Sequence, residues 1–212
     1  MSLMEQIGEN LMKGKAKDVA ALVQQAVDEG VAPEKVLNEG LLPAMNTVGV
    51  RFKNNEVYVP EVLIAARAMK AGTEILRPIL AEAGIEPKGK VVIGTVKGDL
   101  HDIGKNLLCM MVEGAGLKVI DIGIDVEPQK FVDAAKENGA GVIGVSALLT
   151  TTMTNMKAVV EAVKAEGLAD NVKVMIGGAP VTQAFADEIG ADGYAPDAAS
   201  GAELAKKLAG IE

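Results

Sequence analysis

The sequence predicts an α/β protein in which an N-terminal four-helix bundle precedes a Rossmann-like, flavodoxin-like doubly wound sheet of five parallel strands. In the first part of the chain, apolar residues recur at helical spacing. In the second part, short apolar runs alternate with segments long enough for one crossover helix. A Gly/Pro/Lys segment at 84–90 separates these two patterns. We therefore expect a helical domain at 1–86 and an α/β domain at 87–212.

Four helices are expected in the first domain. Apolar residues at 3, 7 and 11, and again at 19, 23 and 27, define the first two helices. Pro33 suits the first turn of a third helix that reaches Phe52. Pro60 suits the start of the fourth, whose end Pro78 should kink or shorten. These lengths are typical of a helix bundle.

Five strands are expected in the second domain. Buried parallel strands are predicted at 91–96, 117–123, 141–148 and 172–178, with a weaker one within 190–196. Each is followed by a helical segment, and right-handed crossovers between such units produce an open doubly wound sheet. Ligands of these sheets bind outside the carboxyl ends of the strands. The segments that follow the strands are therefore the ones to search for a site.

Composition excludes several classes of function. The formal net charge of −8 and an aromatic content of 2% argue against nucleic-acid partners. No apolar run approaches the ~18 residues of a membrane helix, and the N-terminus does not resemble a secretory signal. Cys109 is the sole cysteine, so an intrachain disulfide is impossible. We expect a cytoplasmic protein that has no nucleic-acid or membrane partner.

The single histidine lies directly after the first predicted strand. His101 stands between Asp99 and Asp102 in "GTVKGDLHDIGKN". The stretch lacks the glycine spacing of nucleotide loops, and its carboxylates would repel phosphate. Taken alone, it fits a helix-capping or hydrogen-bonded loop histidine and a ligand site about equally well.

Three more strand ends favour the ligand site. Ser146, Thr150 and Thr152 follow the third strand, while Gly177 and Gly178 end the fourth. Glycine lets a large ligand approach the backbone closely. With small residues after the fifth strand, these segments predict a cleft lined by glycine and hydroxyl groups, with an imidazole at its mouth.

These motifs together resemble those of cobalamin-binding domains. Residues 99–104 match the DxHxxG signature, residues 146–148 match the SxL motif, and Gly177-Gly178 match the GG motif. Residues 48–70, "VGVRFKNNEVYVPEVLIAARAMK", resemble the helical cap of methionine synthase. In order and spacing, nearly the whole chain is similar to the corrinoid proteins of three-component methyltransferase systems, which serve methylamines, methanol, glycine betaine or aryl methyl ethers.

The resemblance implies a cofactor and a role for each motif residue. The cofactor is cobalamin, alternating between methylcobalamin and cob(I)alamin, with His101 as the lower cobalt ligand in place of the dimethylbenzimidazole tail. Asp99 and Thr152 would form a relay behind the imidazole, coupling proton uptake to methyl loss. Contacts to the corrin or its side chains would come from Gly98, Asp102, Ile103 and Gly104. The nucleotide tail would be lined by Ser146, Leu148, Thr150, Gly177, Gly178 and Ala198.

The residues of the predicted cap allow two interpretations. Phe52, Val59, Val62 and Leu63 match positions that cover the upper corrin face, and each fits an ordinary bundle core equally well. By the same resemblance, the bundle would swing away during turnover, with 83–90 as the hinge. Val59 is smaller than its counterpart in methionine synthase, which would loosen the cap.

The function implied is that of a methyl carrier that needs separate enzymes for catalysis. Its partners would be a substrate-specific methyltransferase, a second methyltransferase of the methyltetrahydrofolate or coenzyme M type, and a reductive activating protein. A cobalamin-binding sensor is the alternative, although it would need an output domain. A cobalamin isomerase subunit ranks last, since such subunits do not normally carry this cap.

Overall fold

The computed structural model describes residues 1–85, 87 and 89–211. Its contacts divide the chain into two compact units, Met1–Glu86 with Gly114–Gly116, and Pro87–Glu113 with Leu117–Glu212. Two positions of the expected hinge at 83–90, residues 86 and 88, lie outside the described residues. None of the helices among the described residues combines the length and apolar character of a membrane span.

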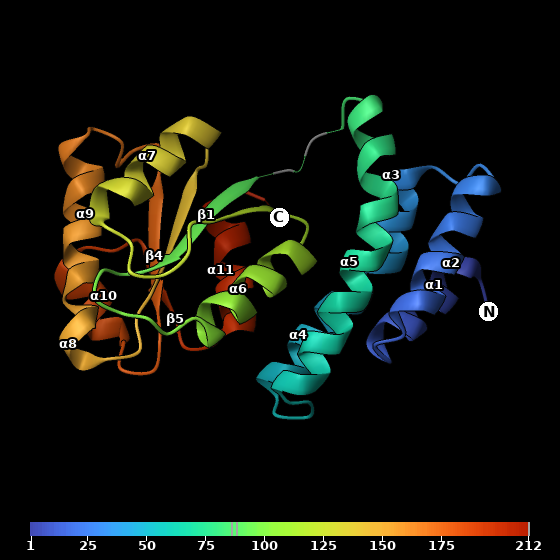
Figure 1. Ribbon diagram of the computed structural model, residues 1–212, viewed down its shortest axis with the longest axis horizontal. Coiled ribbons are helices and arrows are strands. Elements are labelled where there is room, and N and C mark those ends of the chain that lie inside the picture. The colour runs from blue at the N-terminus through green and yellow to red at the C-terminus, as the bar shows by residue number, and fades with distance from the viewer. Residues whose placement is uncertain (86, 88, 212) are drawn as a thin grey trace. The chain divides into compact units, whose positions relative to one another are not determined.

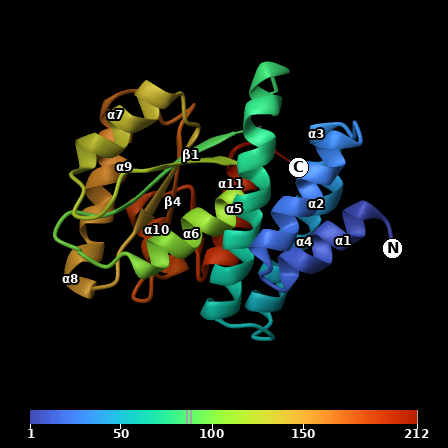
Figure 2. The same cartoon turned by 45° about the vertical axis from the view of Figure 1, so that its right-hand side comes forward.

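The first unit is a helical bundle. Helices α1 (Leu3–Met12), α2 (Ala16–Asp28) and α5 (Val59–Glu82) flank a third helical stretch made of α3 (Pro33–Lys35), η1 (Val36–Leu41) and α4 (Leu42–Lys53). Within the unit, α2 and α5 pack along each other, and α1 packs on η1 and α4 (Figure 2). The fully buried side chains include Ile7, Leu11, Val19, Val23, Leu41 and Leu76.

The third helix contains a π-helical turn. Across η1 the hydrogen bond lengthens, and the Leu42 N–H donates to the carbonyl of Leu37, five residues back. Pro43, at the start of α4, has no N–H and its ring crowds the carbonyl four residues earlier. A widened turn immediately before Pro43 relieves this conflict without ending the helix.

Helix α5 begins as expected, but it continues beyond Pro78. The Tyr58 N–H donates to Glu61 Oε2 over 3.0 Å, which satisfies a backbone group that the helix start leaves free. Pro78 is exposed and lies inside the helix, which ends only at Glu82. The expected shortening at Pro78 is therefore not observed, because water can reach the carbonyl that the proline leaves without a donor.

The second unit is a five-stranded parallel sheet with helices on both faces, which confirms the predicted fold class (Figure 1). The strands are β1 (Lys90–Thr95), β2 (Lys118–Asp121), β3 (Val142–Ser146), β4 (Lys173–Gly177) and β5 (Gly193–Ala195), in the order β2-β1-β3-β4-β5. The order reverses between β1 and β3, and this switch point is where such sheets bind ligands.

Helices cover the two faces of the sheet unequally. One face carries α7 (Pro128–Asn138), α9 (Asn155–Ala165) and α10 (Gln183–Ile189), and the other carries α6 (Ile103–Gly114) and α11 (Ala198–Leu208) (Figure 1). A short helix, α8 (Thr150–Met153), precedes α9. The α7 face is tightly packed: a Cβ at Gly94 would lie 2.9 Å from Phe131 Cε1. The sheet is therefore closely packed, and the loops that follow its strands at the carboxyl edge form the candidate site.

Candidate functional site

The DxHxxG residues lie in the loop that joins β1 to α6, at the switch point of the sheet. Thr95, the last residue of β1, pairs with Ser146, the last residue of β3. This register brings the segments after the two strands to the same edge. The Thr95 hydroxyl then donates a 3.0 Å hydrogen bond to the His101 carbonyl and ties the loop back to its strand.

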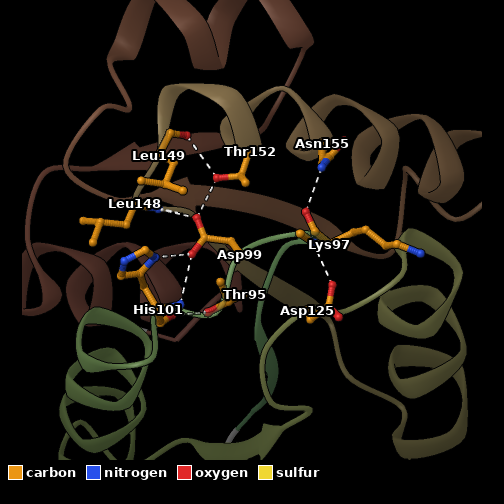
Figure 3. Close-up of polar contacts among 10 residues, drawn as sticks. Thr95, Lys97, Asp99, His101, Asp125, Leu148, Leu149, Thr152 and Asn155 are labelled. Atoms are coloured by element: carbon orange, nitrogen blue, oxygen red, sulfur yellow. Dashed lines mark hydrogen bonds and ion pairs between the residues drawn. The ribbon is translucent and has the colours of Figure 1, made fainter.

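Asp99, His101 and Thr152 form a continuous chain of hydrogen bonds (Figure 3). His101 Nδ1 lies 2.7 Å from Asp99 Oδ1, and the Thr152 hydroxyl donates to Asp99 Oδ2 over 2.6 Å. Two backbone N–H groups complete the set: His101 donates to Oδ1 over 3.0 Å and Leu148 to Oδ2 over 2.8 Å. The carboxylate therefore accepts four hydrogen bonds, two at each oxygen.

These donors keep Asp99 ionised although its side chain is completely buried. Burial by itself raises the pKa of the carboxyl, but the hydrogen bonds from Thr152, Leu148 and His101 outweigh that effect. The pKa of Asp99 consequently lies well below its usual range. A carboxylate beside Nδ1 can only accept, so the neutral imidazole carries its proton on Nδ1.

The imidazole is held at one nitrogen and open on its other side. The His101 side chain is 48% exposed, whereas that of Asp99 is not exposed at all. With Nδ1–H directed at the carboxylate, the lone pair of Nε2 is available to bind a metal. The carboxylate thus orients the imidazole and leaves its second nitrogen on the exposed side.

Exposed aliphatic residues flank His101 in the sequence and also occur in the loop after the neighbouring strand β3. Leu100 is 69% exposed and Ile103 is 74% exposed, on either side of His101. Leu148 and Leu149, in the loop after β3, are also exposed. Apolar side chains exposed beside a polar anchor are typical of a surface that a ligand covers.

The GG motif has a structural role that the sequence did not reveal. A Cβ at Gly178 would lie only 1.8 Å from the carbonyl oxygen of Ala147, and Gly178 has a φ of +133°. A Cβ at Gly177 would lie 3.0 Å from the Ala195 carbonyl oxygen. Gly178 thus lets the loops after β3 and β4 approach each other, and Gly177 lets the ends of β4 and β5 do so, which shapes the sheet edge itself.

The other residues predicted to contact cobalamin in this unit also lie at the carboxyl edge. Asp102 immediately precedes α6, and its carbonyl accepts from the Asn106 N–H over 2.7 Å, so it begins the helix. A Cβ at Gly104, in the first turn, would meet nothing within 4 Å. The remaining positions are Gly98 in the histidine loop, Ile103 at the start of α6, Ser146 at the end of β3, Thr150 at the start of α8, and Ala198 at the start of α11.

The four predicted cap residues belong to the helical unit. Phe52 lies near the end of α4, and Val59, Val62 and Leu63 lie in the first turns of α5. Val62 is fully buried, whereas Leu63 is 40% exposed. Leu63 therefore presents more apolar surface than Val62, whose burial matches the bundle-core reading.

Two residues that the motifs did not indicate contact the histidine loop. Asp125 lies between β2 and α7, and its carboxylate accepts from the Gly98 N–H over 2.7 Å. Asn155 begins α9, and its amide donates to the Lys97 carbonyl over 2.8 Å. Asp125 follows the strand beside β1, so its place at a carboxyl edge was the available signal. Asn155 lies inside a helical pattern that carried no such signal.

Comparison with protein families gives this geometry a context. A family model described as a B12 binding domain matches residues 89–203, and a second model with the same description matches residues 3–77. The first match includes Asp99, His101, Thr152 and both glycines of the GG motif. The second covers the helices of the bundle through most of α5.

Curated relatives and solved structures resemble the chain over nearly its whole length. It is 46% identical to a corrinoid protein of Desulfitobacterium hafniense over 99% of both chains, and 45% identical to a dimethylamine corrinoid protein of Methanosarcina barkeri over 97% of both. Among solved structures, the methanol:cobalamin methyltransferase complex MtaBC of M. barkeri matches with a TM-score of 0.87 and 28% identity, over 98% of this chain and 80% of that one.

A cobalamin-binding protein from D. hafniense matches with a TM-score of 0.81 and 31% identity, over 98% of both chains. Both halves of the sequence thus match cobalamin-binding proteins, and the predicted cofactor is confirmed as cobalamin. This chain belongs to the corrinoid proteins of methyltransferase systems.

Proposed function

We propose that this protein is a methyl carrier that binds cobalamin with its dimethylbenzimidazole tail displaced and with His101 as the lower cobalt ligand. It would shuttle a methyl group between a substrate:corrinoid methyltransferase and a second methyltransferase, whose acceptor is tetrahydrofolate or a thiol. The observation that carries this proposal is the Thr152–Asp99–His101 chain, which leaves Nε2 of an exposed imidazole free to bind metal.

The residues present fit the cofactor. Neutral imidazole is a good ligand for cobalt, and Asp99 supplies the partner that fixes its tautomer and raises its basicity. The exposed Leu100 and Ile103 suit the apolar face of a large macrocycle. Gly104 leaves open space at the start of α6, where a side chain would limit close approach.

The chain of hydrogen bonds provides a means of adjusting the ligand. When bound, cobalamin supplies the cobalt to which a methyl group is attached and from which it is removed. Asp99 can accept or share the Nδ1 proton of His101, and the Thr152 hydroxyl stabilises the carboxylate form. More negative charge on Asp99 makes Nε2 a stronger donor, so proton movement along this chain adjusts the basicity of the lower ligand.

The relatives indicate the class of partner. One is named a dimethylamine corrinoid protein, and one solved neighbour lies in a methanol:cobalamin methyltransferase complex. We therefore propose a substrate-specific methyltransferase as the first partner, with methylamines or methanol as the favoured donor classes. The bundle (1–86) is proposed to cap the cofactor bound by the α/β domain (87–212), and a reductive activating protein would restore oxidised cofactor.

The ligand assignment is tested with the full chain and hydroxocobalamin. The absorption spectrum of the reconstituted protein is compared with that of His101→Ala. We expect the axial-ligand bands to shift in the variant while cobalamin stays bound. Identical spectra would show that His101 is not the lower ligand.

The carrier role needs a separate assay. Candidate methyltransferases for methylamines, methanol, betaine and aryl methyl ethers are each added with their substrates, and methyl transfer to the reduced bound cobalamin is followed. Transfer with one donor class supports the proposal and identifies the donor. Failure with every class would contradict the carrier role and favour a cobalamin sensor.

A further inference from the structure

One peptide unit of the histidine loop is held at both of its edges. The carbonyl of Lys97 accepts a 2.8 Å hydrogen bond from Asn155 Nδ2, and the N–H of Gly98 donates a 2.7 Å hydrogen bond to Asp125 Oδ1. These two groups belong to the same peptide bond. Figure 3 shows the two side chains approaching the loop from different elements, Asn155 from α9 and Asp125 from the segment after β2.

Contacts at both edges fix the orientation of a peptide plane. In a trans peptide the C=O and N–H point in opposite directions, so a single contact leaves the plane free to tilt and a pair of contacts does not. Asp125 also contacts the residue after Gly98: its backbone N–H donates to the carbonyl of Asp99 over 3.1 Å. Gly98 adopts a φ of +79°, which permits the sharp turn between these contacts.

We propose that Asp125 and Asn155 are positioning residues that clamp the 97–98 peptide and thereby aim the carboxylate of Asp99 at His101 Nδ1. Asp99 is the next residue along the chain, so a tilt of the clamped plane moves its Cα and swings its side chain. The Asp99–His101 contact is 2.7 Å long and tolerates little displacement. Thr152 and Leu148 donate hydrogen bonds to the other carboxylate oxygen, whereas Asp125 and Asn155 bond to the backbone at 97–98.

The two hydrogen bonds of the clamp run in opposite directions, since Asp125 accepts and Asn155 donates, and this difference makes the proposal testable. Asp125 acts on Gly98 only as an acceptor, and an asparagine oxygen at the same place can also accept, although without the charge. Asn155 acts on Lys97 only as a donor, and a carboxylate cannot replace it. Asp125→Asn should therefore preserve the clamp, whereas the isosteric Asn155→Asp should break it by facing a carbonyl with a negative charge.

Both substitutions are compatible with folding. Asp125 has a φ of +53°, a conformation that asparagine adopts as readily as aspartate. Asn155 is the first residue of α9, where a carboxylate interacts favourably with the helix dipole. The matched control is Asn138→Asp: Asn138 Nδ2 donates to the Ala134 carbonyl over 2.9 Å within α7, the same kind of contact outside the loop.

The readout is the tautomer of His101 in the full chain without cofactor. Because His101 is the only histidine, ¹⁵N labelling of histidine gives one pair of ring-nitrogen signals. These are measured at about pH 9, well above the ordinary histidine pKa of about 6.5. We expect the wild type to hold the Nδ1–H form, since the Asp99 carboxylate accepts that proton.

In Asn155→Asp and Asp125→Ala, the ratio of the Nδ1–H to the Nε2–H form should fall about tenfold, the effect of weakening a hydrogen bond to a charged group. Asp125→Asn and Asn138→Asp should keep the wild-type ratio. A wild-type ratio in both Asn155→Asp and Asp125→Ala would overturn the proposal, as would an equal fall in Asn138→Asp.

A second variant guards against misfolding. If the amide spectrum shows that Asn155→Asp is not folded, Asn155→Ala removes the donor without adding charge, and the same fall in ratio is expected. The importance of the tautomer rests on the proposed function, but this measurement uses no cobalamin. It can therefore fail while His101 still binds cobalt, or succeed when the cobalamin spectra show that it does not.

Discussion

Thr152 donates a 2.6 Å hydrogen bond to Asp99 although 53 positions of sequence separate the two residues. The contact exists because β1 and β3 are neighbours in the sheet and end in register, Thr95 beside Ser146. The loops that follow these strands then emerge side by side. A fully buried carboxylate at that point requires donors from both loops, and each loop supplies them.

Removing the Asp99 carboxylate should lower stability. Asp99→Ala removes the acceptor of the partly buried Leu148 N–H and the nearer acceptor of the buried Thr152 hydroxyl, whose other acceptor is the Leu149 carbonyl at 3.1 Å. We expect the free energy of unfolding to fall by about 2–4 kcal/mol, measured by urea denaturation of the protein without cofactor. Asp170→Ala, which removes an exposed carboxylate far from the loop, serves as the control and should change stability little. A loss no larger than that of the control would contradict the role assigned to these hydrogen bonds.

Stability should also depend on acid through Asp99. Its pKa is lowered in the folded state, so its contribution is fully present above the unfolded-state value of about 4 and is lost as pH falls towards the folded-state pKa. The difference in unfolding free energy between wild type and Asp99→Asn should therefore shrink steadily as pH falls below about 4. A difference that stays constant from neutral pH to the lowest accessible pH would show that the carboxylate is not preferentially ionised in the fold.

The Thr152 hydroxyl can be tested without changing side-chain volume. Thr152→Val retains the shape of the side chain but leaves Asp99 Oδ2 without its shortest donor. We expect a loss of about 1–3 kcal/mol in unfolding free energy, because the hydrogen bond is buried and its acceptor is charged. Thr152→Ser retains the donor and should recover most of that loss. If Thr152→Val were as stable as the wild type, the hydroxyl would contribute nothing.

Gly178→Ala should be the most damaging single methyl addition at the sheet edge. The new Cβ would lie 1.8 Å from the Ala147 carbonyl oxygen, and the φ of +133° is unfavourable for any residue with a side chain. We expect a loss of at least about 3 kcal/mol in stability, or failure to accumulate folded protein. Thermal unfolding monitored by circular dichroism measures it, and a melting temperature like that of wild type would contradict the observed contact.

Gly104→Ala separates folding from cobalamin binding. The added methyl group would meet nothing within 4 Å and replaces glycine inside helix α6, so stability should be unchanged or rise by up to about 1 kcal/mol. If the glycine admits the corrin ring, cobalamin affinity should nevertheless fall about tenfold or more in an equilibrium titration. Wild-type affinity in this folded variant would remove Gly104 from the predicted cofactor contacts.

Local sequence patterns were sufficient to predict the helices of the bundle and the five strands of the sheet, but not the short helix α8. Apolar periodicity at 3, 7 and 11 distinguishes the helices of the bundle from the short apolar runs of the sheet. The π turn before Pro43 was not predicted, because the sequence shows an obstacle at that point but not how the helix adapts to it. Pro78 was predicted to kink or shorten the end of its helix, and it does not shorten it, since an exposed proline can be accommodated inside a long helix.

From the sequence alone, the apolar pattern predicted the fold class, and the spacing within DxHxxG, SxL and GG predicted the cobalamin-binding family, because both signals are local. The relay of Asp99, His101 and Thr152 stays a prediction. Only the tertiary structure decided what holds the histidine loop in place. The clamp joins Asn155 and Asp125 to a single peptide bond, and their separation in the chain carries no signal. The order of the strands brings α9 and the segment after β2 to the two sides of that loop, and sheet order is a property of the whole domain that no short motif contains.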